Sequence, residues 1–417
     1  MQQYQHNIRF ECPRMALYES MKQKPLCASL NKASRGLREM HMNNKIVLFI
    51  AVFLLTPIIF LSCQKEKTYT LEVKDGVRYV HNLKPKYDKP TAGLEFIQQI
   101  GEFEPEDENY MFNQPLSVAE DEEGNIFILD AEDYCVKKFT ADGKYVSRFG
   151  RQGQGPGEFQ YPMTIDCRGQ SLLVTSMPSV FHLFDLNGQY IDLFRVPQYQ
   201  GISMKLMNSN HAVAYSMSPR GENTTQNKIL RIYDLQGKVL REFGEPFLVD
   251  NANSSWTANF LAIAVDHQDN IFISFIHQNR IEKYSGSGKL LMKIDRELPY
   301  ELEYKYKKAK MEIRGVIREY LDQDFPYVSS GIGVDGKGRI WVLTSKKEVP
   351  EVTEGMDFTI QEYLVFEVYS EDGILLTRVP FPEKIETFDN WTMYEDKAYF
   401  VDPRGQACVY VYKVIWK

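Results

Sequence analysis

The stretch Asp142-Gly-Lys-Tyr-Val-Ser-Arg-Phe-Gly150 returns later in the chain as Gln236-Gly-Lys-Val-Leu-Arg-Glu-Phe-Gly244. Both copies place Phe-Gly at the same distance from a turn glycine, and looser copies surround Gly188, Gly288 and Gly373. A polar turn followed by a strand-length run is typical of a β-hairpin, and repetition of the unit at fixed intervals is typical of repeat folds. The repeat therefore decides the architecture, while it leaves the chemistry open.

Each repeat reads as a series of short strands separated by Asp, Asn and Gly turns. The intervals Gly124 to Gly143, Gly169 to Gly188 and Asp269 to Gly288 are all nineteen residues long. Aromatic residues make up 13% of the 417 residues, which suits strands because aromatic side chains pack well on a pleated surface. The sequence predicts an all-β fold of four-stranded antiparallel sheets, arranged as a propeller over residues 94–417.

Five repeats are complete, and the sixth lacks its fourth strand at the C-terminal end. Residues 94–100 carry the same apolar-to-glycine ending as Val146 to Gly150. A strand from this segment would complete the last sheet and remove an open edge. We therefore expect six blades, in a ring closed by an N-terminal strand.

The motifs around the repeats resemble a known family. Phe149-Gly-Arg-Gln-Gly-Gln-Gly-Pro-Gly-Glu-Phe159, Tyr161-Pro162, Asn279-Arg-Ile281 and the hairpin sequence from Val73 to Asn82 resemble NHL-type propellers. They resemble more closely the six-bladed β-propeller lipoproteins of Bacteroidetes. The resemblance implies the same fold and export from the cytoplasm, and it implies almost nothing about activity.

The N-terminal part predicts an exported, lipid-anchored protein. Residues 46–61 form an apolar run after Lys45, too short for a typical membrane span, and the ending Phe60-Leu-Ser-Cys63 resembles a bacterial lipobox. We expect a signal peptide over residues 42–62, lipidation of Cys63, and a linker with a hairpin over 63–93. An uncleaved anchor helix is the alternative. Residues 1–41 fit no export signal and predict a disordered or mis-annotated leader.

Charge and cysteine content exclude several classes of function. From Cys63 onward acidic residues outnumber basic ones by twelve, which argues against nucleic acid and against electrostatic adhesion to anionic lipid. Beyond the leader and Cys63, three cysteines remain, at 135, 167 and 408, with no Cys-x-x-Cys spacing, so neither a zinc site nor a disulfide framework is expected. No metalloprotease or serine hydrolase motif is present. We predict no cofactor, no metal and no catalytic residue.

One insertion in the fifth repeat has a different period. Apolar residues such as Leu302, Tyr306, Ala309 and Ile313 recur at helical spacing, between Leu298-Pro299 and Phe325-Pro326. The pattern predicts a helical insertion over residues 298–325. Insertions in propellers often lie on the binding face.

A binding site is expected where the loops enter the innermost strands, near the propeller axis. By repeat position the candidate axial pocket consists of Asn113, Gln114, Tyr161, Asn259, Ser330, Asp389 and Asn390. Amides and hydroxyls of this kind suit a neutral polar ligand such as a glycan, although they could equally hydrate the channel mouth. We expect a monomeric, non-catalytic binding or scaffold module for a glycan or protein partner in the cell envelope, in the outer membrane and facing the periplasm or the exterior. The alternative is a propeller hydrolase or lyase with an axial metal site.

Overall fold

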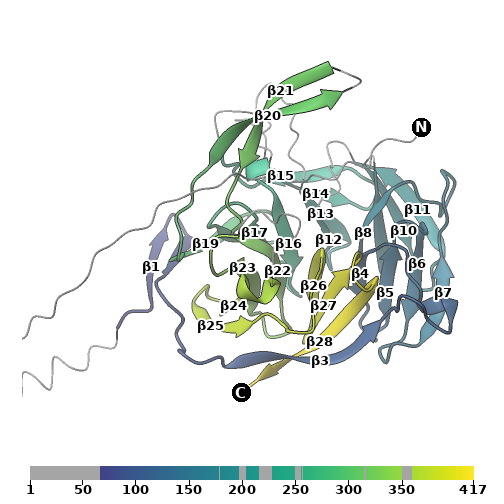
Figure 1. The fold of residues 1–417 in the computed structure, drawn as a ribbon, viewed down its shortest axis with the longest axis horizontal. Helices are drawn as coiled ribbons and strands as arrows, with labels where there is room; N and C mark the ends of the chain where they lie inside the picture. The colour runs from purple at the N-terminus through teal and green to yellow at the C-terminus, as the bar shows by residue number, and fades with distance from the viewer. Residues whose placement is uncertain are drawn as a thin grey trace, which may run out of the picture. The chain divides into compact units, whose positions relative to one another are not determined.

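The computed structural model describes residues 66–177, 179–196, 203–215, 228–248, 255, 257–313, 316–349 and 359–417. The predicted leader, the signal peptide and Cys63 lie outside these residues. Five four-stranded antiparallel sheets and one six-stranded sheet, which contains a four-stranded antiparallel blade, surround a common centre (Figure 1). No described helix is long and apolar enough to cross a membrane.

Each sheet is one blade, with its first strand innermost. Blade one consists of β4 (Pro115–Glu120), β5 (Ile126–Asp130), β6 (Cys135–Phe139) and β7 (Tyr145–Phe149). Blade two consists of β8 (Pro162–Arg168), β9 (Ser171–Ser176), β10 (Val180–Phe184) and β11 (Tyr190–Arg195). Blade three consists of β12 (Met204–Leu206), β13 (His211–Tyr215), β14 (Leu230–Asp234) and β15 (Val239–Phe243).

The second half of the ring repeats this order. Blade four consists of β16 (Leu261–Val265), β17 (Ile271–Phe275), β18 (Ile281–Tyr284) and β19 (Leu290–Arg296). Blade five consists of β22 (Ser329–Val334), β23 (Ile340–Ser345), β24 (Leu364–Tyr369) and β25 (Leu375–Pro380). Blade six consists of β26 (Asn390–Tyr394), β27 (Lys397–Asp402), β28 (Cys408–Trp416) and β3 (Ala92–Ile100). Two short 3-10 helices, Glu108–Tyr110 and Ile360–Glu362, lie in connections.

The ring closes as the sequence predicts. β3 pairs with β28 in antiparallel register, from Val409 opposite Ile100 to Trp416 opposite Ala92. The innermost strands of successive blades contact one another, and β26 of blade six contacts β4 of blade one. The prediction of six blades closed by an N-terminal strand is confirmed.

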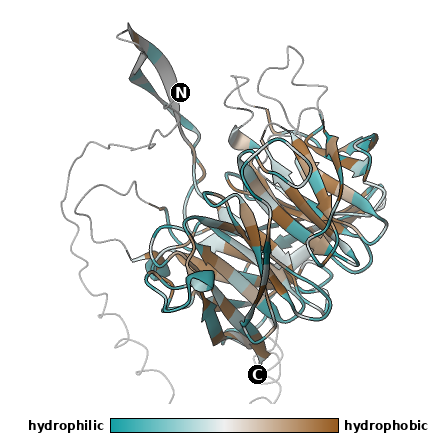
Figure 2. Ribbon diagram, turned by 90° about the vertical axis from the view of Figure 1, so that its right-hand side faces the viewer, coloured by the Kyte–Doolittle hydropathy of each residue, from teal (hydrophilic) through white to brown (hydrophobic). Residues whose placement is uncertain are grey.

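The hydrophobic core is divided among the gaps between blades. Six clusters of buried residues are found, and each combines side chains from two neighbouring blades. The middle strands are therefore buried on both faces, as in β5, where all five residues are buried. Figure 2, coloured by residue hydropathy, shows hydrophobic residues along the strands and hydrophilic residues in the turns.

The repeated turn glycine forms a joint between blades. Gly188 and Gly288 have φ near +80°, a conformation that suits glycine because it lacks a Cβ. A Cβ on Gly288 would lie 2.9 Å from the ring of Phe243, which ends the outer strand of the preceding blade. Gly188 lies against Phe149 in the same way. The glycine and the apolar end of the outer strand recur together because they meet across each blade interface.

The predicted helical insertion is wrong, because its residues form a β-hairpin. β20 (Lys305–Ile313) pairs with β21 (Val316–Asp324) in antiparallel register, and the hairpin stands away from the blades (Figures 1 and 2). The register places Lys310 opposite Glu319, and their charged groups lie 3.4 Å apart. Cross-strand pairs of opposite charge and β-branched residues such as Val316 and Ile317 favour the sheet over the helix.

A second hairpin extends blade four outward. β1 (Tyr69–Lys74) pairs with β2 (Val77–Asn82), and β2 pairs in parallel with β19. Asp75 and Gly76 form its turn with φ of 52° and 76°, as expected for a two-residue turn with left-handed backbone. Blade four thus has six strands, and β1 is the outer edge.

Candidate functional site

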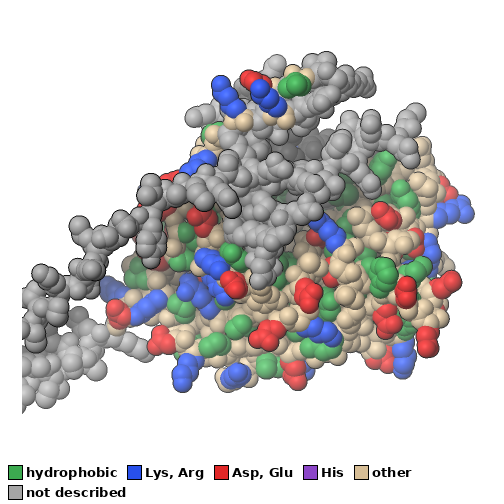
Figure 3. All heavy atoms as spheres, in the orientation of Figure 1, with side chains coloured by type: hydrophobic (Ala, Val, Ile, Leu, Met, Phe, Trp, Pro, Cys, Tyr) green, Lys and Arg blue, Asp and Glu red, His purple; other side chains and the backbone are tan. Residues whose placement is uncertain are grey.

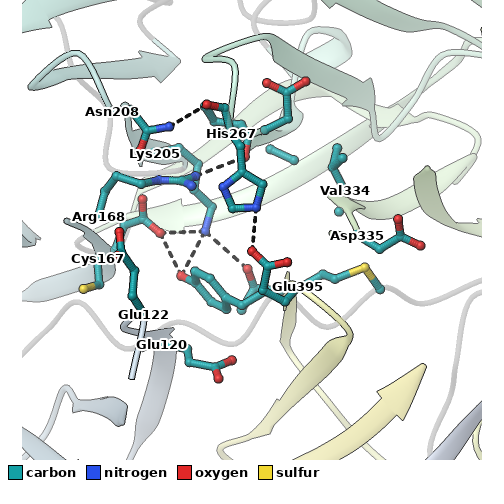
Figure 4. Close-up of a pocket in the computed structure, with 18 of the residues that line it drawn as sticks. Glu120, Glu122, Cys167, Arg168, Lys205, Asn208, His267, Val334, Asp335 and Glu395 are labelled. Atoms are coloured by element: carbon teal, nitrogen blue, oxygen red, sulfur yellow. Dashed lines mark hydrogen bonds and ion pairs between the residues drawn. The ribbon is translucent and has the colours of Figure 1, made fainter. Parts of the chain in front are cut away.

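A cavity of about 320 Å³ lies on the propeller axis, at the C-terminal ends of the innermost strands (Figure 4). All six blades contribute to its wall. The polar and charged residues that line it are Glu120, Asp121, Glu122, Asp166, Arg168, Lys205, Asn208, Asp266, His267, Asp335, Thr392, Tyr394 and Glu395. From here on we call this cavity the axial pocket; its residues differ from those of the candidate pocket predicted from the sequence.

Three aspartates of the wall hold turns in place. Asp121, Asp266 and Asp335 each follow an innermost strand, and each carboxylate accepts backbone N–H groups from residues two and four positions later. Such side-chain-to-backbone bonds stabilise tight turns. These carboxylates are engaged by their own loops, so they shape the pocket more than they offer free ligands.

A buried ion pair joins blades two and three in the pocket and forms hydrogen bonds with blade six. The Lys205 ammonium of blade three donates to Asp166 of blade two at 2.9 Å and to the hydroxyl of Thr392 of blade six at 3.2 Å. Tyr394, also of blade six, donates its hydroxyl to Asp166 at 2.8 Å. Because blades three and six lie opposite each other in the ring, the bond from Lys205 to Thr392 spans the centre of the ring. Burial raises the pKa of the Tyr394 phenol well above its usual range, so this group remains a donor.

Two further contacts span the pocket. Arg168 of blade two donates to the carbonyl of Val265 in blade four at 3.1 Å, while its Nε is buried without a hydrogen-bond partner in the described structure. His267 of blade four lies 2.5 Å from a carboxylate oxygen of Glu395, which follows the innermost strand of blade six. In Figure 4 a dashed line joins His267 to Glu395 across the cavity, and Arg168 lies beside Lys205. The pocket is therefore lined by side chains whose positions are fixed by partners on other blades.

Glu120 is a half-buried residue of the pocket wall, with two donors from blade six. Lys397 and Tyr399 donate to its two oxygens at 2.5 and 2.6 Å. Burial nevertheless raises the pKa of Glu120, because desolvation outweighs these bonds. This arrangement joins blade six to blade one beside the ring closure.

The candidates predicted from the sequence lie at the opposite ends of the innermost strands. Asn113 and Gln114 directly precede β4, and their backbone N–H groups both donate to Asp130 at 2.9 Å. Tyr161 precedes β8 and is 69% exposed. These three residues fall where the repeat alignment places them, yet none lines the axial pocket.

The remaining candidates have local partners at the same ends. The Asn259 amide is fully buried and bonds to the backbone of Phe247 and Ser255, which makes it a structural residue. Asp389 pairs with Arg404 at 2.9 Å. Ser330 lies in β22 and Asn390 begins β26. None of these four lines the axial pocket either, so their role as a binding site stays a prediction.

One signal in the sequence could have indicated the axial pocket. Asp166 and Lys205 are charged residues within short strands that are otherwise mostly apolar, as in Met204-Lys205-Leu206. A buried charge requires a charged partner, and these two residues satisfy each other. The sequence predicted a site at the loops that enter the innermost strands, whereas the axial pocket lies at the C-terminal ends of these strands.

The described side chains do not form a metal-binding group. Among the described residues, no group of three or more His, Cys, Asp or Glu side chains is placed to hold a metal ion. The described cysteines 135, 167 and 408 are buried and unpaired, and burial raises the pKa of Cys135 and Cys408 to about 12. The described residues therefore give the alternative of an axial metal enzyme no geometric support.

The fold defines a class: the protein is a six-bladed β-propeller with a cavity on its axis. Residues 107–290 match the family described as "DUF5128: 6-bladed beta-propeller". The chain is similar to that family over this part, and the resemblance to six-bladed propellers seen in the sequence is confirmed. No curated protein matches the sequence.

Two solved structures share the fold. One is a protein of Bacteroides fragilis NCTC 9343 described as inferred to be exported, with 9% identity and a TM-score of 0.53 over 81% of this chain and 99% of that one. The other is a member of the duf4221 family from Bacteroides vulgatus, with 9% identity and a TM-score of 0.51 over 85% of this chain and 100% of that one. At this level of identity the likeness shows the fold alone.

Proposed function

We propose that the protein is a lipoprotein of the cell envelope, anchored through Cys63, whose propeller binds a glycan in the axial pocket without catalysing a reaction. The observation that carries the proposal is a cavity of about 320 Å³ lined from all six blades by cross-braced polar groups. Small-molecule sites are typically concave and largely preformed, with volumes of about 300–1,000 Å³. Residues already held in place lose little further freedom when a ligand binds.

The charged residues that line the pocket favour a neutral ligand over an anionic one. Seven carboxylates line it, against only Arg168 and Lys205, so an anionic ligand is disfavoured. Glu122 and Glu395 are exposed at the rim, where their oxygens can accept hydrogen bonds. Sugars present many hydroxyl donors in a small uncharged body, which suits such acceptors. A neutral glycan therefore fits better than a phosphate or a nucleotide.

Export and anchoring rest on the sequence. The apolar run before Phe60-Leu-Ser-Cys63 supplies a signal, and a diacyl anchor holds stably where a single chain does not. The two Bacteroides structures support only the propeller fold of the exported part. We propose that the protein acts as a monomer on the outer membrane, facing the periplasm or the exterior, and that it presents the axial pocket to soluble or cell-wall glycans.

The test combines a glycan array with titration calorimetry of each hit on the purified chain. Glu395→Gln and Glu122→Gln should each weaken binding about tenfold, because a hydrogen bond to a charged group contributes about 1.5–3 kcal/mol. Asn113→Ala, at the other ends of the strands, is the matched control and should leave affinity unchanged. Loss of binding only in the Asn113 variant would move the ligand to the opposite end of the channel. The absence of any glycan hit, or stoichiometric metal in the purified protein, would count against the proposal.

A further inference from the structure

The outward hairpin of blade four carries a concentration of exposed apolar residues. Eighteen large hydrophobic residues are exposed in the described chain, and five of them fall within residues 71–87. These five are Leu71, Val73, Tyr79, Leu83 and Tyr87. Val73 is 63% exposed and Leu71 is 45% exposed, and both lie on one face of β1 because they are two positions apart. Tyr79 is opposite Glu72 and therefore lies on the other face, so Leu71 and Val73 form the exposed apolar surface of this face of β1.

The edge of the hairpin is also unpaired in the described structure. β1 is the last strand of the six-stranded sheet, and it lies at the rim, away from the other blades (Figure 1). A free strand edge is normally blunted, covered or paired. The two strands β1 and β2 are joined by a tight turn, so the edge keeps its alignment.

The length of chain before the hairpin limits where it can go. Six residue steps separate Cys63 from Tyr69. An extended chain spans at most about 3.6 Å per residue, so β1 begins within about 20 Å of Cys63. If Cys63 carries acyl chains, the hairpin is therefore held beside the headgroup layer whatever path residues 64–68 take.

The local charge permits this contact without driving it. Residues 66–93 contain six basic and four acidic residues, whereas the chain as a whole has a net charge of −7. Arg78 is paired with Asp372, and His81 lies 2.5 Å from Asp295. Figure 3 shows acidic and basic side chains interspersed on the described surface that it displays. The contact would thus depend on apolar area, which agrees with the absence of a polybasic segment.

We propose that the β1–β2 hairpin lies on the lipid bilayer surface, with Leu71 and Val73 in the interface, and holds the rim of blade four against the membrane. This inference rests on the proposed anchoring at Cys63. Since a propeller axis is perpendicular to the direction from centre to rim, the axis would then run roughly along the membrane. The mouth of the axial pocket would face sideways, open to ligands beside the surface.

The experiment places a fluorescent probe at Val73→Cys in the acylated full-length protein. Cys135, Cys167 and Cys408 are buried and should not label, and Cys63 is consumed by acylation. Ile191→Cys is the matched control, because Ile191 is 53% exposed on β11, the outer strand of blade two. The labelled proteins are reconstituted in vesicles of phosphatidylethanolamine and phosphatidylglycerol that contain a lipid-borne quencher. We expect several-fold stronger quenching at position 73 than at position 191, and Leu71→Cys should behave like Val73→Cys.

Equal quenching at the two positions would overturn the proposal. Flotation with vesicles separates it from the anchor: loss of flotation in Cys63→Ser supports lipidation independently of the probe. If the native chain does not float, the same labelled chains carry Cys63→Ser and an N-terminal histidine tag in place of residues 1–62, and they are held on nickel-chelating lipid. Selective quenching at position 73 then still supports the hairpin contact, and its absence rejects it.

Discussion

Replacing Gly288 by Ala should destabilise the propeller through two separable effects. Gly288 has φ of +77°, where an L-residue costs about 1–2 kcal/mol. The new Cβ would lie 2.9 Å from the Phe243 ring, well inside ordinary contact, and overpacking of a buried site costs about 1–3 kcal/mol. We expect a loss of about 2–5 kcal/mol in the free energy of unfolding, measured by urea denaturation of the purified chain.

The matched control is Gly338→Ala. Gly338 has φ of +73°, but a Cβ there would meet nothing closer than a side-chain atom of Glu371 at 3.9 Å. This variant should lose only the backbone cost, about 1–2 kcal/mol. A double-mutant cycle with Phe243→Leu should reduce the cost of Gly288→Ala, because the smaller side chain gives way. Equal losses at Gly288 and Gly338, with no coupling to Phe243, would refute the idea that the glycine joins adjacent blades.

Three further predictions follow from buried charge and from the N-terminal motif. Burial lowers the pKa of His182 from 6.5 to about 4, so the free energy of unfolding should fall by on the order of 2–3 kcal/mol as the pH falls from about 6.5 towards 4. Urea denaturation at each pH measures this loss, and His182→Phe should remove the contribution of His182 to it. Arg296→Met should cost about 3 kcal/mol by the same assay, because it removes the 2.6 Å partner of the buried Glu367 carboxylate, which keeps Arg378 at 2.9 Å, whereas replacement of both Arg296 and Glu367 by apolar residues should cost less. Cys63→Ser should move the protein from the membrane fraction to the soluble fraction on cell fractionation, and an unchanged distribution would contradict lipidation.

The architecture could be predicted because the repeated sequence pattern contains the residues that contact one another between adjacent blades. The turn glycine and the apolar residue ending the outer strand are both visible in the sequence, and Gly288 and Phe243 show that they touch across a blade interface. The count of six and the closing strand followed from the same pattern. Local sequence preferences and the packing of the blades favour the same structure here, so the fold could be predicted from the sequence.

The insertion and the pocket could not be predicted for two different reasons. Seven apolar positions between 302 and 320 fit a helical period, so the sequence pattern favoured a helix. The hairpin depends on cross-strand pairs such as Lys310 and Glu319, whose pairing is not apparent from their positions in the sequence. The pocket depends on contacts such as that between Asp166 and Tyr394, which come from blades two and six. No local pattern connects these residues, so their meeting is decided only by closure of the ring.

The pairing of β3 with β28 also constrains when the molecule can finish folding. β3 is synthesised before the innermost strands of all six blades, yet its partner β28 is the last strand described in the chain. Until β28 has been synthesised, β3 has an exposed backbone edge while the five complete blades can already assemble. Contacts between such distant parts of a chain form slowly, and unpaired edges promote aggregation in the interval. A chain interrupted by a late stop codon would therefore be left as an open arc, which chaperones and proteases could recognise by its unpaired β3 strand.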